Sequence, residues 1–162
     1  MYKVAIITAS DKGYAGERED KSGSVIEEIV TAHELEVTGK VILPDDRQML
    51  SDQMLNYCHQ GIDLILTTGG TGFSKRDVTP EATADIVERR ADNLTFAMIA
   101  NSLQYTPKAM LSRGIAGIRE NTLIVNLPGS PKAVRENLEY AIDAIIHGVK
   151  ILNGDDAECA RK

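Results

Sequence analysis

The chain has 162 residues, which fits one domain with an ordinary hydrophobic core. Its formal net charge of −6 argues against a general nucleic-acid-binding protein, because such a protein needs a basic surface to displace counterions. No apolar run approaches the roughly 18 residues of a membrane span, so no membrane partner is expected.

Apolar runs of strand length alternate with segments of helical spacing along the chain. Strands are expected over 3–9, 36–43, 62–67, 114–118 and 122–127. Helices are expected from about Ser22, after Asp45 or Asp46 as the cap, from Pro80 to about Arg90, over 94–104, over 107–112 and from Pro131 onward. Residues 10–20 are polar and contain glycine, so a loop is expected there. One domain is expected over 1–153, followed by a charged, disordered tail over 154–162.

This alternation predicts an α/β fold with a mostly parallel sheet and helices on both faces. In such sheets, ligands bind beyond the carboxyl ends of the strands, where the strand order reverses. Four segments that follow strands are therefore expected to meet at one edge of the sheet: the loop from Ser10, the turn 44–46, the glycine-rich loop from Gly69 and the turn 128–130.

The glycine-rich loop carries the strongest functional signal, Thr-Gly-Gly-Thr-Gly-Phe-Ser-Lys-Arg-Asp over residues 68–77. Its three glycines let backbone amides approach an anion closely. Lys75 and Arg76 are cationic partners for phosphate oxygens, and Asp77 offers a hard oxygen ligand for Mg²⁺. The pattern indicates a nucleotide-phosphate site.

The helix that follows this loop supports the same interpretation. Thr79 is expected to cap it, with Pro80 at its first position, so that the positive end of the helix faces the loop. The segment is not a P-loop, because no Lys precedes a Ser or Thr at the helix start, and its glycine spacing differs from the dinucleotide-binding fingerprint. An ordinary tight turn is the alternative, but such a turn does not require residues 75–77.

A second turn of similar composition follows the last strand, over residues 126–132. Ser130 is expected to cap the long C-terminal helix, with Pro131 at its first position, and either caps alone or also contacts a ligand. Lys132 and Arg135 in the first turn of that helix either bind a phosphate or lie on a solvated helix face.

The cysteines and histidines indicate no metal or redox site. Only two cysteines occur, Cys58 and Cys159, and no signal-peptide cleavage pattern is present, which favours a cytoplasmic protein without a disulfide framework. Cys58 is expected to be a small buried residue beside Met54. The three histidines lack metal-ligand spacing, so no zinc site is expected.

Together these motifs resemble the Mog/MoaB-type molybdopterin-binding domains of molybdenum-cofactor biosynthesis. The resemblance extends from residue 3 to about 152 and is carried by residues 10–11, 43–46, 68–72, 76–83, 111–113, 117 and 126–132. It implies a three-layer α/β/α sandwich with a mostly parallel central sheet, and a homotrimer. In the active branch of the family it implies Mg-ATP-dependent transfer of AMP to the terminal phosphate of molybdopterin, and hand-over of the product to a molybdate-insertion protein.

The resemblance also assigns roles to individual residues. Asp45 and Asp77 would be the catalytic residues and would hold one or more Mg²⁺ ions on the triphosphate. No side-chain base is required, because a phosphate monoester with a second pKa of about 6 is largely ionised at neutral pH. ATP and molybdopterin would be bound by Ser10, Asp11, Thr68, Gly69, Gly70, Thr71, Gly72, Lys75, Arg76, Thr79, Glu81, Asn126, Pro128, Gly129, Ser130 and Lys132.

Simpler roles for the two aspartates stay open at this point, since Asp45 can serve as a helix cap and Asp77 can order its loop. Inactive members of the family depart from the Asp-Val-Thr-Pro segment and the Asn-Leu-Pro-Gly turn, and this chain retains both. We therefore expect an active adenylyltransferase. The alternatives are a non-catalytic molybdopterin-binding scaffold and a generic nucleotide-binding α/β protein.

Overall fold

The computed structural model describes residues 1–155, in which one sheet contains six strands in the order β2-β1-β3-β6-β5-β4. Four neighbouring strands run parallel: β2 (Glu36–Leu43), β1 (Lys3–Ala9), β3 (Leu64–Thr68) and β6 (Thr122–Leu127). The strand β5 (Ala116–Arg119) is antiparallel to β6 and to the short edge strand β4 (Arg89–Arg90). The predicted mostly parallel sheet is confirmed.

The central strands are buried on both faces, which explains why they are apolar throughout. All of β3, and β1 from Val4 to Ala9, is buried. Successive side chains alternate between the two faces, so that Val4 and Ile6 belong to one hydrophobic core, and Ala5 and Ile7 to the other. Two separate cores therefore stabilise the sheet from opposite sides.

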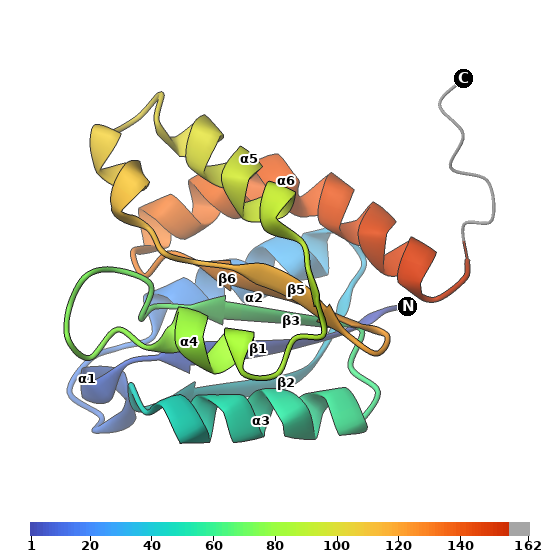
Figure 1. The fold of residues 1–162 in the computed structure, drawn as a ribbon, viewed down its shortest axis with the longest axis horizontal. Helices are drawn as coiled ribbons and strands as arrows, with labels where there is room; N and C mark the ends of the chain where they lie inside the picture. The colour runs from blue at the N-terminus through green and yellow to red at the C-terminus, as the bar shows by residue number, and fades with distance from the viewer. Residues whose placement is uncertain (156–162) are drawn as a thin grey trace.

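Helices form the outer layers of the molecule (Figure 1). One face of the sheet packs against α2 (Lys21–Ala32), α5 (Asp92–Ser102) and α6 (Pro131–Leu152), and the other against α3 (Arg47–His59) and α4 (Thr79–Ala84). Two short elements lie in the connections, the helix α1 (Asp11–Tyr14) and the 3-10 helix η1 (Pro107–Leu111). This arrangement is the expected three-layer α/β/α sandwich.

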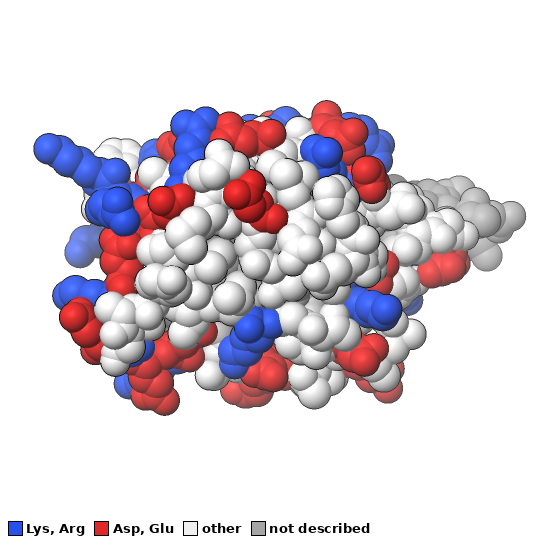
Figure 2. Space-filling model, turned by 90° about the horizontal axis from the view of Figure 1, so that it is seen from below, with Lys and Arg blue, Asp and Glu red and all other residues white. Residues whose placement is uncertain are grey.

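The surface shows no single basic field on the face seen in Figure 2, which is viewed from the side of α3. Acidic and basic side chains are interspersed around a broad area without charged residues. Within residues 1–155, no helix has the length and apolar character that crossing a membrane requires.

One expected helix is wrong in its second half. The helix α4 ends at Ala84 instead of continuing to about Arg90, and Arg89 and Arg90 form β4. Pairing with β5 overrides the helical spacing, because the Glu88 N–H donates to a β5 carbonyl at 2.9 Å. The Val87 side chain lies directly on Gly117 of β5, where an added Cβ would come within 2.7 Å of Val87 Cγ1.

Two expectations about the loops are also wrong. Thr79 is the first residue of α4 and not its cap, and no side chain caps this helix. The Thr79 N–H instead donates to the Gly70 carbonyl at 3.1 Å, which holds Thr79 against the glycine-rich loop. Residues 11–14 form α1 inside the expected loop 10–20, because the Ser10 hydroxyl accepts the Gly13 N–H at 3.0 Å.

At the C-terminal end, α6 finishes at Leu152. Of the expected disordered tail over 154–162, only Gly154 and Asp155 fall within the described residues. Residues 156–162, including Cys159, lie outside them.

Candidate functional site

A polar cleft of about 780 Å³ lies at the carboxyl ends of β1 and β3. The strand order reverses between these strands, because β2 lies on one side of β1 and β3 lies on the other. All four segments expected at this edge contribute to the lining, together with Asp77. The lining includes Ser10, Asp45, Thr68, Gly69, Gly70, Asp77, Gly129 and Ser130. The predicted convergence of the four segments is confirmed.

Backbone forms much of the cleft wall where the glycine-rich loop leaves β3. Gly69 has a φ of +88°, and a Cβ there would lie 2.4 Å from the Ala9 carbonyl oxygen. Gly70 has a φ of +69°, and a Cβ there would lie 2.3 Å from Thr79 Oγ1. Both positions therefore require glycine, and the loop presents peptide groups to the cleft instead of side chains.

Hydrogen bonds join the segments that surround the cleft. Thr68 Oγ1 donates to the Pro128 carbonyl at 2.6 Å, which ties the ends of β3 and β6 together. Ser22 Oγ at the start of α2 donates to the Gly129 carbonyl at 2.6 Å. Asp20, which caps α2, accepts the Thr8 hydroxyl at 2.8 Å. Hydrogen bonds within the chain thus hold the segments around the cleft in place.

Asp11 connects two of these segments instead of pointing into the cleft. Its carboxylate accepts the Asp45 N–H at 3.0 Å, and its own N–H donates to Asp45 Oδ2 at 3.1 Å. Arg76 Nε and Nη2 donate to the same carboxylate at 3.0 and 2.9 Å. The Arg76 guanidinium, with the Asp45 N–H, lowers the pKa of Asp11 below its ordinary value of 3.8. Asp11 and Arg76 were expected to contact ligand, and here they pair with each other.

Two buried oxygens beside Gly70 have no hydrogen-bond partner among the described residues. They are Asp45 Oδ1 and Thr79 Oγ1, which lie 3.1 and 2.3 Å from the point where a Gly70 Cβ would stand. Burial raises the pKa of the Asp45 carboxyl above 3.8, and the nearby Asp11 and Asp77 charges add to the effect. Unsatisfied buried oxygens cost stability. Of the two residues, Asp45 lines the cleft, whereas Thr79, which was expected to contact ligand, is fully buried and lines neither cavity.

The carboxylates of Asp45 and Asp77 suit a hard divalent cation that is shared with a substrate. Both line the cleft, and Asp45 Oδ1 has a free acceptor site. Asp77 Oδ2 accepts the Ser74 N–H at 3.0 Å, so its carboxylate is already oriented by its own loop. Residues 1–155 contain no group of three or more His, Cys, Asp and Glu side chains that could enclose a metal. Mg²⁺ is commonly bound by one or two carboxylates plus substrate phosphates, and these residues fit that pattern.

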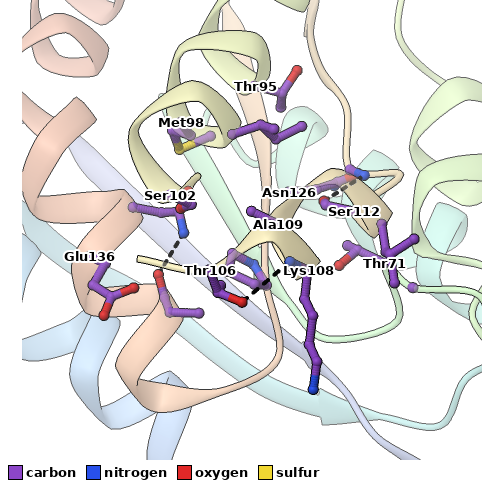
Figure 3. Close-up of a pocket in the computed structure, with 17 residues that line it drawn as sticks. Thr71, Thr95, Met98, Ser102, Thr106, Lys108, Ala109, Ser112, Asn126 and Glu136 are labelled. Carbon is purple, nitrogen blue, oxygen red and sulfur yellow. Dashed lines mark hydrogen bonds between the residues drawn. The ribbon is translucent and has the colours of Figure 1, made fainter. Parts of the chain in front are cut away.

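A second, more apolar cavity of about 300 Å³ lies on the α5 side of the glycine-rich loop (Figure 3). Thr95, Met98 and Ser102 of α5 face η1 and the end of β6 across it. Four of the expected ligand-binding residues line this cavity and not the cleft: Thr71, Gly72, Asn126 and Pro128. Its apolar walls with a few polar groups suit a flat ring better than a phosphate.

Asn126 also has a structural role beneath this cavity. Its Oδ1 accepts the Ile115 N–H at 3.0 Å, and its Nδ2 donates to Thr67 Oγ1 at 2.9 Å and to Thr83 Oγ1 at 3.0 Å. The amide therefore joins β6, β3 and α4.

The remaining expected ligand-binding residues lie outside both cavities. Lys75 is exposed in the glycine-rich loop, and Lys132 lines a separate surface groove with Arg135. Glu81 forms an ion pair with Arg113, so its carboxylate stabilises the folded loop.

Ser130 caps α6 through the Ala133 N–H at 3.2 Å, as expected, and also lines the cleft.

Several residues at the site were not predicted from the sequence, among them Arg18, Asp20 and Lys21 in the cleft lining and Arg113 behind the loop. Asp20 lines the cleft, and its Asp-x-x-Gly spacing to Gly23 is a recognisable helix-cap signal. Arg113 contacts the glycine-rich loop over a distance of about forty residues in the chain. It belongs to the segment 111–113 that carries the family resemblance, but the resemblance assigned it no role.

Comparison with known proteins identifies relatives across almost the whole chain. The model of a family described as "Probable molybdopterin binding domain" matches residues 5–147. A molybdopterin adenylyltransferase from Helicobacter pylori (strain J99) is 38% identical over 155 residues, covering 94% of this chain and 88% of that protein. Gephyrin from Dictyostelium discoideum is 41% identical over 160 residues, but this chain spans only 22% of its length.

A crystal structure shares the fold closely. The molybdopterin biosynthesis enzyme MoaB from Thermus thermophilus is 42% identical and superimposes with a TM-score of 0.90. The match covers 95% of this chain and 98% of that one.

Proposed function

The chain belongs to the family of molybdopterin-binding domains, and from this premise we propose that it is a molybdopterin adenylyltransferase. In this reaction the terminal phosphate of molybdopterin attacks the α-phosphorus of ATP. A new P–O bond joins AMP to molybdopterin, the bond between the α- and β-phosphates breaks, and pyrophosphate leaves.

One observation carries the proposal: a polar cleft lined by Asp45 and Asp77, among other residues, and a more apolar cavity lie on either side of a single glycine-rich loop. Gly69 and Gly70 line the cleft, and Thr71 and Gly72 line the cavity. The substrates of this reaction combine flat heterocycles with phosphate groups, so each needs an apolar wall close to a polar one. The names of relatives such as the Helicobacter pylori enzyme point to the same chemistry.

The residues of the chain would act mainly by positioning. Peptide groups of residues 69–72 and 129–130 would bind phosphate oxygens and bring the two anions into line. The attacking phosphate needs no side-chain base, since its second pKa of about 6 leaves it largely ionised at neutral pH. The Asp11–Arg76 pair would keep Asp45 in place, because Asp11 holds the Asp45 backbone. Mg²⁺ held by Asp45 and Asp77 would neutralise charge on the triphosphate and on the departing pyrophosphate.

The proposal includes several finer points that derive from the family resemblance. We propose that ATP is the nucleotide, that the metal is Mg²⁺, and that the protein is a cytoplasmic homotrimer that hands its product to a molybdate-insertion protein. Light scattering on the purified protein checks the trimer, and titration of activity with Mg²⁺ and Mn²⁺ checks the metal.

The decisive experiment incubates the protein with molybdopterin, MgATP and a pyrophosphatase, and measures adenylated pterin by mass spectrometry. We expect product with the wild-type protein. The Asp77→Asn variant keeps an oxygen that can accept the Ser74 N–H, so it should fold and bind ligand. It should turn over on the order of 1000-fold more slowly, because it loses the charge that recruits the cation.

The outcomes separate the enzyme from the alternatives. Molybdopterin binding without any ATP-dependent product would indicate a scaffold. Nucleotide binding without molybdopterin binding would indicate a generic nucleotide-binding protein. Wild-type turnover by Asp77→Asn would remove the metal role from this residue while leaving the reaction intact.

A further inference from the structure

Arg113 donates four hydrogen bonds to residues 71–81, which include most of the glycine-rich loop and the start of α4. Its Nε donates to the Gly72 carbonyl at 2.8 Å, and its Nη2 donates to the Asp77 carbonyl at 2.8 Å. Its Nη1 pairs with the Glu81 carboxylate. Its backbone N–H donates to the Thr71 carbonyl at 2.8 Å. One residue thus binds the segment between Thr71 and Glu81 at four places, all with directed hydrogen bonds.

These contacts join the walls of the two cavities. Ser112 and Gly114, the chain neighbours of Arg113, line the apolar cavity. Asp77, whose carbonyl Arg113 binds, lines the polar cleft. The Arg113 and Glu81 side chains are 35% and 36% exposed, so the pair is partly shielded from water and its geometry is defined by the surrounding backbone.

We propose that Arg113 is a positioning residue for the reaction: it fixes the loop 71–77 so that the Asp77 carboxylate stands at the cleft in the geometry that productive cation and nucleotide binding requires. The role depends on the proposed adenylyl transfer. The side chain touches neither cavity directly, and it acts through the backbone of the loop that both cavities share.

Lysine cannot replace arginine in this role. Its ammonium is a point charge, whereas the guanidinium fork reaches two carbonyls and a carboxylate in fixed directions. The variant Arg113→Lys should therefore keep the charge and the Glu81 ion pair but loosen the loop. A purely structural arginine would be replaced by lysine with little effect on turnover.

The chain offers a matched control in Arg119. This residue is also partly buried and donates from Nη1 to a backbone carbonyl, that of Ile86, at 2.8 Å. It lies at the β5–β6 turn, away from both cavities. Loss of an arginine–carbonyl contact as such is therefore measured by Arg119→Met, and loss of loop positioning by Arg113→Met.

The experiment measures kcat, KM for ATP and the Mg²⁺ concentration for half-maximal activity, together with Tm, in the wild-type protein and the three variants. A loop displaced by about 1 Å costs up to roughly 100-fold in rate, so we expect such a loss of kcat in Arg113→Met. Arg113→Lys should lose about tenfold at a wild-type Tm and should need more Mg²⁺, since its ammonium holds the loop less rigidly. Arg119→Met should lose Tm but keep kcat.

A second readout does not depend on catalysis. Lys75 and Arg76 lie exposed in the same loop and are the natural trypsin sites there. Both Arg113 variants should be cleaved there faster than the wild-type protein and than Arg119→Met. If Arg113→Met fails to fold, Arg113→Lys carries the test.

The outcomes distinguish this role from the function on which it depends. If the wild-type protein makes no adenylated product, the proposed function and the positioning role fall together. If the wild-type protein is active, and Arg113→Lys matches it in kcat, Mg²⁺ dependence and trypsin sensitivity, only the positioning role is overturned.

Discussion

Two helices of this protein begin where a hydroxyl residue precedes a proline, but the hydroxyl group has a different role in each. At α6, Ser130 precedes Pro131, and its hydroxyl accepts the Ala133 N–H at 3.2 Å. At α4, Thr79 precedes Pro80, but Thr79 already belongs to the helix and its buried hydroxyl has no partner among the described residues. The first helix has 22 residues and the second has six.

The difference shows where the folded chain leaves bonding capacity unused. At the start of α6, the Ser130 hydroxyl satisfies the Ala133 N–H of the same helix. The start of α4 lies against Gly70, beside an Asp45 oxygen that is also unsatisfied. A protein gains no stability from such groups, because a buried oxygen without a partner costs about 1–3 kcal/mol. The start of α4 therefore has unused bonding capacity directly behind the cleft wall, in which Asp45 is the residue that a ligand can contact.

The largest expected effect separates two adjacent acids. Asp46 caps α3 by accepting the Met49 N–H at 2.9 Å, whereas Asp45 faces the cleft. Asn caps as well as Asp, so Asp46→Asn should change neither stability nor activity by much. Asp45→Asn should lose activity on the order of 1000-fold while remaining folded, because it removes charge from the proposed cation site. Steady-state kinetics with matched melting curves test this, and equal activity losses in both variants would refute the distinction.

The second effect compares two glycines that lie next to each other in the cleft wall. Gly69 has a φ of +88°, and its added Cβ would meet the Ala9 carbonyl oxygen at 2.4 Å. At Gly129 the nearest atom to an added Cβ is Gly69 Cα, at 3.5 Å, which is an ordinary contact. Gly69→Ala should lower the free energy of unfolding by about 3 kcal/mol through strain and overpacking. Gly129→Ala should change it little, and urea unfolding measures both.

A structural feature of this protein could be predicted from the sequence when residues close together in the chain determine it. Strands such as β3 can be recognised from apolar runs, because burial on both faces excludes polar side chains. The meeting of four loops at one edge follows from parallel topology and was also predictable. The end of α4 was not, since it depends on Val87 lying on Gly117 and on pairing with β5.

The residues of the site also fall into those that the sequence identifies and those whose role depends on distant contacts. The glycines and Asp77 could be identified from the residue types that phosphate and Mg²⁺ require, and Asp45 from the family resemblance. All of them line one of the two cavities. The role of Arg113 could not be identified, even though the segment 111–113 belongs to the resemblance, because its contacts are with carbonyl groups far away in the chain. Likewise, nothing local says that the carboxylate of Asp11 is occupied by Arg76 instead of a ligand.

The third prediction tests the two helix starts directly. Ser130→Ala removes a working cap and should lower the free energy of unfolding by about 1 kcal/mol. Thr79→Val removes a hydroxyl that has no partner among the described residues, so stability should stay the same or rise by about 1 kcal/mol. Activity should change little in Thr79→Val, because this buried hydroxyl lines neither cavity. A loss of stability in Thr79→Val would show that the hydroxyl is satisfied within the protein after all.

The smallest expected effect concerns how the short helix α4 is held at its other end. Arg47 at the start of α3 donates from Nε and Nη2 to both oxygens of Asp85, each at 2.7 Å. This pairing lowers the pKa of Asp85 below its ordinary value of 3.8. A carboxyl whose pKa is lowered by folding stabilises the protein above its unfolded pKa, and this contribution disappears as the pH falls through the lower, folded value.

The difference in Tm between the wild-type protein and Asp85→Asn should therefore be small and constant above about pH 5, and should shrink once the pH falls below about 4. Salt should reduce it as well, because both side chains are exposed. The matched control is Glu139→Gln, which breaks an exposed i,i+4 ion pair with Arg135 on the long, capped helix α6. Because α6 is long and capped while α4 has six residues and no side-chain cap, Asp85→Asn should cost more than Glu139→Gln. The reverse order would mean that α4 needs no support from α3.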